Sequence, residues 1–181
     1  MLPWHWFILP REKKTVAKSF RINEDALDAL REEARSQTLS LNTLVNQLLV
    51  NYAQAGRYFR RTNAATLTRQ TLNQLVNALS EDTIIQAGQN AGKTAPQELI
   101  TAKHGGITVG NVVDYVHDLS AHANWFEYTE KNEGGHSTIT LMHEMGRNWS
   151  LFIAHYLTEA FTAAGCKAKY EVADRYVTFA I

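Results

Sequence analysis

A single short strand before two helices is the feature that most constrains how this chain can fold. Residues 15–22, TVAKSFRI, alternate in side-chain character and end with Phe20 and Ile22, which predicts a strand. Asn23 is a favourable N-cap for a first helix, and Ser40 is one for a second. A lone strand leaves a row of backbone donors and acceptors unpaired, so this segment needs a partner.

Fewer than forty residues, 15–53, make up this strand and its two helices, which is too little to build a stable core alone. The unpaired strand and the insufficient core are both resolved when two copies associate. The strands then pair antiparallel across a twofold axis, and four helices share one core. The sequence therefore predicts a homodimer, or a higher homo-oligomer assembled from such dimers.

The order of these elements, SFRINEDALDAL followed by SLNTLVNQLL, resembles the ribbon-helix-helix family, the Arc, MetJ and CopG type of repressor. In that family the paired ribbon enters the DNA major groove, and its outward side chains read base edges. The resemblance implies that Phe20 and Ile22 face the dimer core, whereas Ala17, Ser19 and Arg21 face the groove. An arginine there can donate two hydrogen bonds to guanine O6 and N7.

The same resemblance implies contacts with the DNA backbone. The first amides of the second helix would bind a phosphate, and nearby lysines would add salt-sensitive attraction. The residues concerned are Lys13, Lys14, Lys18, Ser40, Leu41 and Asn42. Two positions depart from the family pattern, because Ala17 offers only an apolar contact and Lys18 lies on the inward face, where an aliphatic residue is usual.

Charge and cysteine content indicate which partner and which cellular compartment to expect. Residues 11–61 hold ten Lys or Arg and six acids, whereas the remainder holds eight against twelve. This asymmetry indicates a polyanion-binding part, and double-stranded DNA is the expected partner. The single cysteine, Cys166, excludes an internal disulfide framework and is typical of a cytoplasmic protein. The leader MLPWHWFILP is too short to span a bilayer, so no membrane partner is expected.

The remainder of the chain predicts an α+β domain with a small, mostly antiparallel sheet. Helices are expected at 67–79, 81–92, 96–105, 108–121 and 148–165, and strands at 125–131, 137–144 and 167–181. The predicted layout is an arm (1–12), a ribbon-helix-helix domain (13–54), a connector (55–66) and the α+β domain (67–181). SLNTLVNQLL and ITLMHEMGRNWSLFIAHYL together also resemble poorly characterised archaeal proteins with this two-part layout.

Three possible enzyme or metal motifs fail on spacing or context. HEMGRNWS places Arg147 where a zinc protease needs its second histidine. AGQNAGKT has three residues, not four, between Gly88 and the glycine of its Gly-Lys pair, so it lacks the spacing of a phosphate loop. Cys166 follows Gly165, which ends a predicted helix, and is expected to pack at the start of a strand, so it is not expected to act as a nucleophile. We therefore expect no catalytic residue, no metal and no cofactor.

Aromatic residues around HEMGRNWS allow two interpretations, an ordinary core or a small-ligand pocket that uses His143, Arg147 and Trp149. The sequence predicts a homodimeric, site-specific DNA-binding transcription regulator. Its C-terminal domain would sense an unknown small-molecule effector or assemble dimers into larger species. The alternative is a small-molecule- or metal-binding protein whose N-terminal unit only dimerises it. Salt-sensitive affinity for DNA separates the two.

Overall fold

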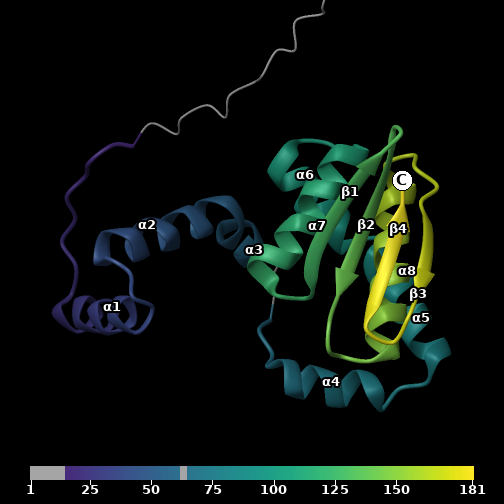
Figure 1. The fold of residues 1–181 in the computed structure, drawn as a ribbon, viewed down its shortest axis with the longest axis horizontal. Coiled ribbons are helices and arrows are strands. Elements are labelled where there is room, and N and C mark those ends of the chain that lie inside the picture. Colours follow the sequence, from purple (N-terminus) through teal and green to yellow (C-terminus); the bar gives the residue numbers. More distant parts are fainter. Residues whose placement is uncertain (1–14, 62–64) are drawn as a thin grey trace, which may run out of the picture. The chain divides into compact units, whose positions relative to one another are not determined.

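The computed structural model describes residues 15–61 and 65–181 (Figure 1). The chain divides into two compact units, and the boundary falls between Gln47 and Leu48. The N-terminal unit holds α1 (Glu24–Ser36) and the start of α2 (Leu41–Asn51). Both helices were expected from the sequence, and both are confirmed. Among the described residues of this unit, only Ala34 and Leu44 are buried, so its core is very small.

The strand predicted for residues 15–22 is not present in the single chain. Residues 15–23 have no regular secondary structure. The physical reason is that a strand exists through hydrogen bonds to a neighbouring strand, and no described segment of this chain supplies one. Val16, Phe20 and Ile22 consequently stay 71%, 69% and 45% exposed.

Helical structure continues beyond α2 into the segment predicted as a connector. A π-helix, η1 (Tyr52–Gly56), and the short helix α3 (Arg57–Arg61) follow α2 without a break in the chain. Ala55 is buried, and the rings of Tyr58 and Phe59 pack on the core of the C-terminal unit. The described part of this segment is therefore a packed element of that unit. The boundaries of the predicted two-part layout stay a prediction.

Five further helices follow the local sequence signals closely. They are α4 (Arg69–Asn77), α5 (Glu81–Gly92), α6 (Ala95–His104), α7 (Val109–Ala123) and α8 (Arg147–Ala163). Thr68, Ser80 and Thr108 each accept a hydrogen bond from the backbone amide three residues on, which caps α4, α5 and α7. Gly105 ends α6 in the left-handed conformation, with φ of 76°.

One antiparallel sheet completes the C-terminal unit. Its strands are β1 (Glu127–Glu133), β2 (His136–Met142), β3 (Lys169–Val172) and β4 (Tyr176–Ala180), arranged in the order β1-β2-β4-β3. The stretch 167–181 is thus a hairpin, in which β3 pairs with β4 and Val172 lies opposite Val177. The predicted α+β class and antiparallel sheet are confirmed.

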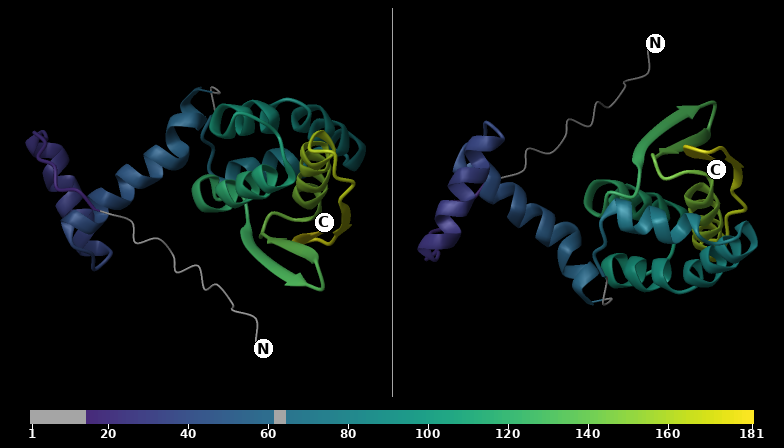
Figure 2. Two further views of the ribbon diagram at one scale, coloured as in Figure 1. Left: turned by 90° about the horizontal axis from the view of Figure 1, so that it is seen from above. Right: turned by 90° about the horizontal axis from the view of Figure 1, so that it is seen from below.

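The sheet and the helices of this unit form two layers. Figures 1 and 2 show the four strands on one side and the helices packed against a single face of the sheet. The side chains on that face are fully buried: Ile139, Leu141, Val177 and Phe179. Met142 and Tyr176, on the opposite face, are 49% and 44% exposed. The core therefore lies between the sheet and α8, as expected when helices cover one face of an antiparallel sheet.

The helices α5 and α8 approach each other very closely at two glycines. A Cβ atom built on Gly88 would lie 2.8 Å from the carbonyl oxygen of Phe152, and one on Gly92 would lie 2.4 Å from that of Tyr156. The glycines of AGQNAG therefore permit contact between two helix backbones, and they serve helix packing.

Candidate functional site

The residues predicted to face DNA lie on the surface of the N-terminal unit. Ala17, Lys18, Ser19 and Arg21 are exposed. Neither Lys18 nor Arg21 makes an ion pair with any residue that the structure describes. Lys13 and Lys14 lie outside the described residues. The exposed side chains of Lys18, Ser19 and Arg21 are thus available to an external partner.

The start of α2 also presents free backbone donors. Ser40 Oγ accepts a hydrogen bond from the Thr43 amide at 3.0 Å and lies 2.7 Å from Thr43 Oγ1. The preceding amides, at Leu41 and Asn42, are in the first turn, where a helix offers no internal acceptor. Ser40 and Asn42 are exposed and Leu41 is half-buried. This end of an 11-residue helix favours an anion.

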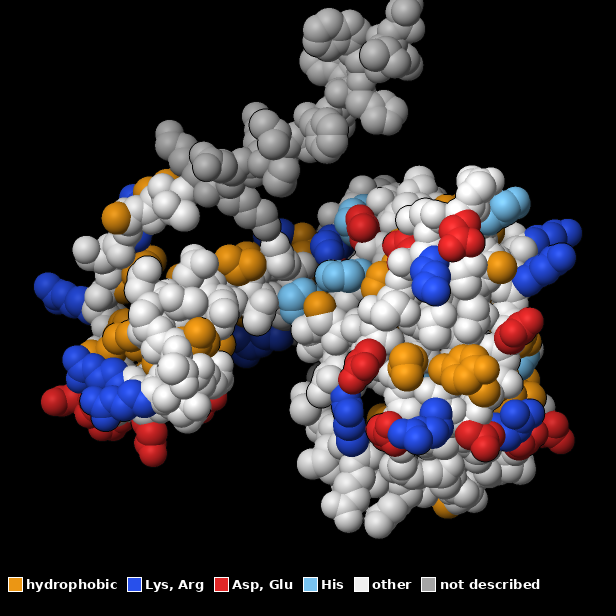
Figure 3. Space-filling model, viewed as in Figure 1, with side chains coloured by type: hydrophobic (Ala, Val, Ile, Leu, Met, Phe, Trp, Pro, Cys, Tyr) orange, Lys and Arg blue, Asp and Glu red, His pale blue; other side chains and the backbone are white. Residues whose placement is uncertain are grey.

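Large apolar side chains are exposed in two stretches of the chain, one in each compact unit. Phe20 and Ile22 belong to the first, and Leu48, Leu49 and Tyr52, which are 47%, 52% and 53% exposed, belong to the second. Orange hydrophobic side chains are visible on the surface of the N-terminal unit in Figure 3. Exposed large apolar side chains of this kind suit an interface with another protein chain.

In the C-terminal unit, His143 is fully engaged by its own turn. Its Nδ1 accepts a hydrogen bond from the Met145 amide at 3.2 Å, so Nε2 carries the proton and donates to Ser150 Oγ at 2.9 Å. The side chain is 8% exposed, and burial lowers its pKa to about 4. His143 is therefore neutral near pH 7 and fixes the connection between β2 and α8.

The neighbouring residues of HEMGRNWS are fastened to different elements. Arg147 pairs with Glu81 of α5 at 3.1 Å, and Trp149 Nε1 donates to the Trp125 carbonyl at 3.3 Å. Asn148 donates to the carbonyls of Val76 and Leu79, which lie at and beyond the end of α4. The structure thus brings His143, Arg147 and Trp149 into one turn. Each of them has a partner within the protein, and a ligand contact there stays a prediction.

The lowered pKa of His143 predicts a loss of stability in acid. An unfolded chain protonates this histidine near pH 6.5, whereas the folded chain does so only near pH 4. Between these values the unfolded chain binds more protons, so the free energy of unfolding falls as pH falls. We expect a loss on the order of 3 kcal/mol between pH 7 and pH 4 from this group.

The measurement is urea denaturation across this pH range for wild type and His143→Gln. Burial also lowers the pKa of His155, so the wild-type trend alone does not identify the group. The variant should show a clearly shallower dependence on pH, whatever its stability at pH 8. Equal slopes for the two proteins would contradict the assignment to His143.

Two cavities of the C-terminal unit bear on the predicted effector. One, of about 10 Å³, lies among η1, α3, α6 and α7, and the other, of about 110 Å³, lies beside His143, Arg69 and Arg175. Pockets for drug-sized ligands occupy roughly 300–1,000 Å³. The first cavity has room for about one water molecule. Neither accommodates an effector of ordinary size in this conformation.

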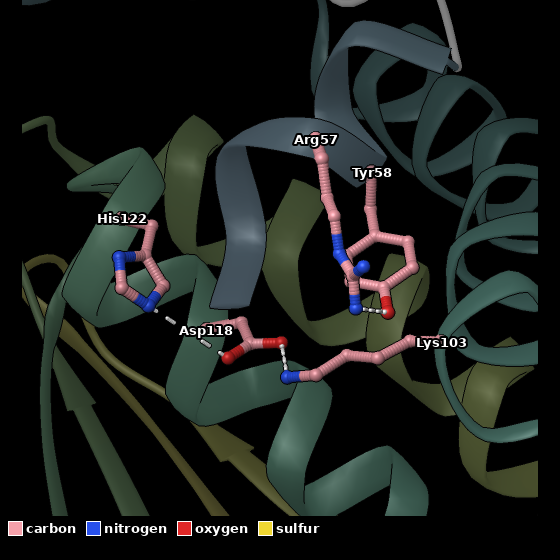
Figure 4. Close-up of polar contacts among 5 residues, drawn as sticks. All are labelled: Arg57, Tyr58, Lys103, Asp118 and His122. Carbon is pink, nitrogen blue, oxygen red and sulfur yellow. Dashed lines mark hydrogen bonds and ion pairs between the residues drawn. The ribbon is translucent and has the colours of Figure 1, made fainter. Parts of the chain in front are cut away.

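A polar cluster beside the smaller cavity was not predicted from the sequence. Lys103 of α6 pairs with Asp118 of α7, and His122 Nε2 lies 4.0 Å from the other carboxylate oxygen (Figure 4). On α3, the Arg57 guanidinium lies 4.5 Å from the centre of the Tyr58 ring and donates to its hydroxyl. The i,i+4 spacing of Asp118 and His122 was the available signal. The ion pair joins α6 to α7.

Two further observations concern possible chemistry in the unit. The hydroxyls of Tyr115 and Tyr156 lie 2.7 Å apart, and burial is the main reason that both have a raised pKa. Both phenols therefore stay protonated at neutral pH. Within residues 15–61 and 65–181, no three His, Cys, Asp or Glu side chains gather in a way that could hold a metal ion.

Comparisons with known proteins give no match to a family model, to a curated protein or to a solved structure. In the described ranges, no helix combines the length and apolar character needed to cross a membrane. The exposed polar and apolar residues of the N-terminal unit are the surface feature that most needs a functional explanation.

Proposed function

We propose that the protein is a homodimeric, site-specific DNA-binding transcription regulator of the ribbon-helix-helix type. The observation that carries the proposal is the exposed segment 15–22, in which Phe20 and Ile22 alternate with Ser19 and Arg21 directly before two helices. This pattern suits a strand with one face toward a protein core and the other toward a groove.

Dimerisation accounts for the apolar half of this pattern. Pairing two copies of residues 15–22 would satisfy the backbone groups that the single chain leaves without a ladder. Phe20 would pass from 69% exposed to buried, which is worth about 1.5–3 kcal/mol for each copy. The exposed Leu48 and Leu49 of α2 supply further apolar surface for the shared core.

DNA accounts for the polar half. Ala17, Ser19 and Arg21 would occupy the outward face of the paired ribbon, with Arg21 donating to a guanine and Ser19 to a base edge. The exposed start of α2, at Ser40, Leu41 and Asn42, would bind a phosphate through its unused amides. Lys13, Lys14 and Lys18 would add attraction to the backbone.

The C-terminal domain is proposed mainly to assemble dimers into larger species. The two cavities described above are smaller than an ordinary effector requires, so neither is a preformed effector pocket. His143, Arg147 and Trp149, the candidate ligand residues, are each held by other residues of the domain. Assembly needs only an exposed surface, and a cooperative operator would benefit from it.

Fluorescence anisotropy with the DNA upstream of the protein's own gene tests the proposal. We expect Arg21→Ala to lose about 1–3 kcal/mol of specific binding, the scale of a lost bidentate base contact. Arg31→Ala is the matched control, because Arg31 is paired with Asp28 on α1. If Arg21→Ala binds as wild type does, the ribbon does not read DNA. A protein that binds DNA only nonspecifically would favour the alternative of a dimerised small-molecule- or metal-binding protein.

A further inference from the structure

A long stretch of this chain contains no acidic residue. Residues 34–80 hold no Asp, no Glu and no Lys. The only charged residues in it are five arginines: Arg35, Arg57, Arg60, Arg61 and Arg69. The stretch spans α2, η1, α3 and α4. Acid-free, arginine-bearing surface is the electrostatic signature of a polyanion contact.

The arginines of this stretch differ in how they are used. Arg69 donates to the carbonyl and side-chain oxygens of Asn124, at 2.9 and 2.6 Å, so it is committed to holding the protein together. Arg60 is exposed and makes no ion pair with any described residue. An unpaired, exposed guanidinium is available to an anion from outside the chain.

Arg57, one turn before Arg60 on α3, is exposed but held in place. Its guanidinium lies 4.5 Å from the centre of the Tyr58 ring and donates one hydrogen bond to the Tyr58 hydroxyl (Figure 4). Tyr58 itself packs on the core of the C-terminal unit. The arrangement reduces the entropy that Arg57 would lose on binding and leaves most of its five N–H donors unused.

We propose that α3 is a second DNA-backbone contact, in which Arg57 and Arg60 each bind a phosphate. This inference rests on the proposed function, because it assigns a further contact to the same DNA. Guanidinium groups pair with phosphate through two parallel hydrogen bonds, which arginine provides and lysine does not. α3 follows α2 and η1 directly in the chain. The contact adds affinity without sequence preference.

Salt dependence of DNA binding is the direct test. Each phosphate contact contributes about 0.9 to the slope of log affinity against log salt concentration. Arg60→Ala removes one contact from each subunit, so we expect the slope of the dimer to fall by about two. Binding should weaken equally for the operator and for unrelated DNA. Arg57→Ala should act in the same direction, and Arg31→Ala should change neither slope nor affinity.

The possible outcomes separate this inference from the proposed function. If wild type binds selectively and Arg60→Ala and Arg57→Ala keep its slope, α3 does not contact DNA, and the ribbon proposal stands. A smaller slope with unchanged operator preference supports the inference. A wild type without affinity for DNA at low salt overturns both proposals. Equal thermal unfolding of the variants and wild type shows that the fold is retained.

Discussion

Replacing Gly92 by alanine is expected to destabilise the C-terminal domain by about 2 kcal/mol or more. A Cβ atom at this position would lie 2.4 Å from the carbonyl oxygen of Tyr156 and 3.0 Å from Cβ of Glu159. These atoms belong to the backbone and the rigid base of a side chain in α8, so no rotamer change relieves the overlap. Alanine is favoured over glycine in a helix by about 1 kcal/mol, which offsets only part of this cost.

Gly106→Ala is the matched control for this prediction. A Cβ atom there meets nothing within 4 Å, and the backbone of Gly106 is not in the left-handed region. The control should leave the free energy of unfolding nearly unchanged or slightly raised, because alanine restricts the unfolded chain. Urea denaturation followed by circular dichroism measures both variants. Equal stability of Gly92→Ala and Gly106→Ala would mean that α5 and α8 are not in backbone contact.

The same glycines show where sequence reasoning stops. The spacing of AGQNAGKT was sufficient to reject a phosphate loop, because that motif is local. The reason for Gly88 and Gly92 lies in Phe152 and Tyr156, more than sixty positions later in the chain. Nothing in the local pattern indicates which helix will cross at that point. Close packing between distant elements therefore had to come from the structure.

Helices and strands were predictable wherever the signal was local. Ser80 and Thr108 are residue types that favour a helix N-cap, and each accepts the capping hydrogen bond at the start of α5 or α7. The helical structure of segment 55–61 was not predicted, because a short, basic run with two aromatic residues is also typical of a linker. Tyr58 and Phe59 become part of the domain only because α6 and α7 provide a surface for them.

In the candidate site, too, local motifs could be predicted from the sequence, whereas contacts between distant residues could not. The failed zinc motif at HEMGRNWS could be identified from its spacing, and its Gly146 has φ of 80°, a backbone conformation that favours glycine. His143 forms its side-chain hydrogen bond with Ser150, in the first turn of α8. No sequence motif predicts this pairing. Lys103 and Asp118 pair across two helices, and that contact depends on how α6 packs on α7.

The N-terminal unit is where the sequence prediction and the single chain differ most. A strand over 15–22 could be predicted from its alternation, yet the backbone of the single chain forms no ladder there, because no described segment pairs with it. The apolar residues of this segment are exposed for the same reason. Adjacent side chains on opposite faces of that predicted strand offer a sharp test of the whole arrangement.

Phe20→Asp is expected to abolish dimerisation, and with it DNA binding. The substitution removes about 1.5–3 kcal/mol of apolar burial and places a carboxylate in the shared core, once in each subunit. Together these costs weaken the dimer by at least roughly a hundredfold. Sedimentation equilibrium should find the variant in species with half as many subunits as wild type at the same concentration, because assembly through the C-terminal domain is left intact. The C-terminal domain, with its own core, should unfold at the wild-type temperature.

Ser19→Asp, at the neighbouring position, should give the opposite combination of results. Its side chain would face the groove, so the dimer should persist while the new negative charge repels DNA. Loss of the dimer in Ser19→Asp, or its retention in Phe20→Asp, would show that the strand faces the other way or does not form. Only an alternating ribbon predicts that adjacent substitutions separate dimerisation from DNA binding, because successive side chains of a strand point to opposite faces.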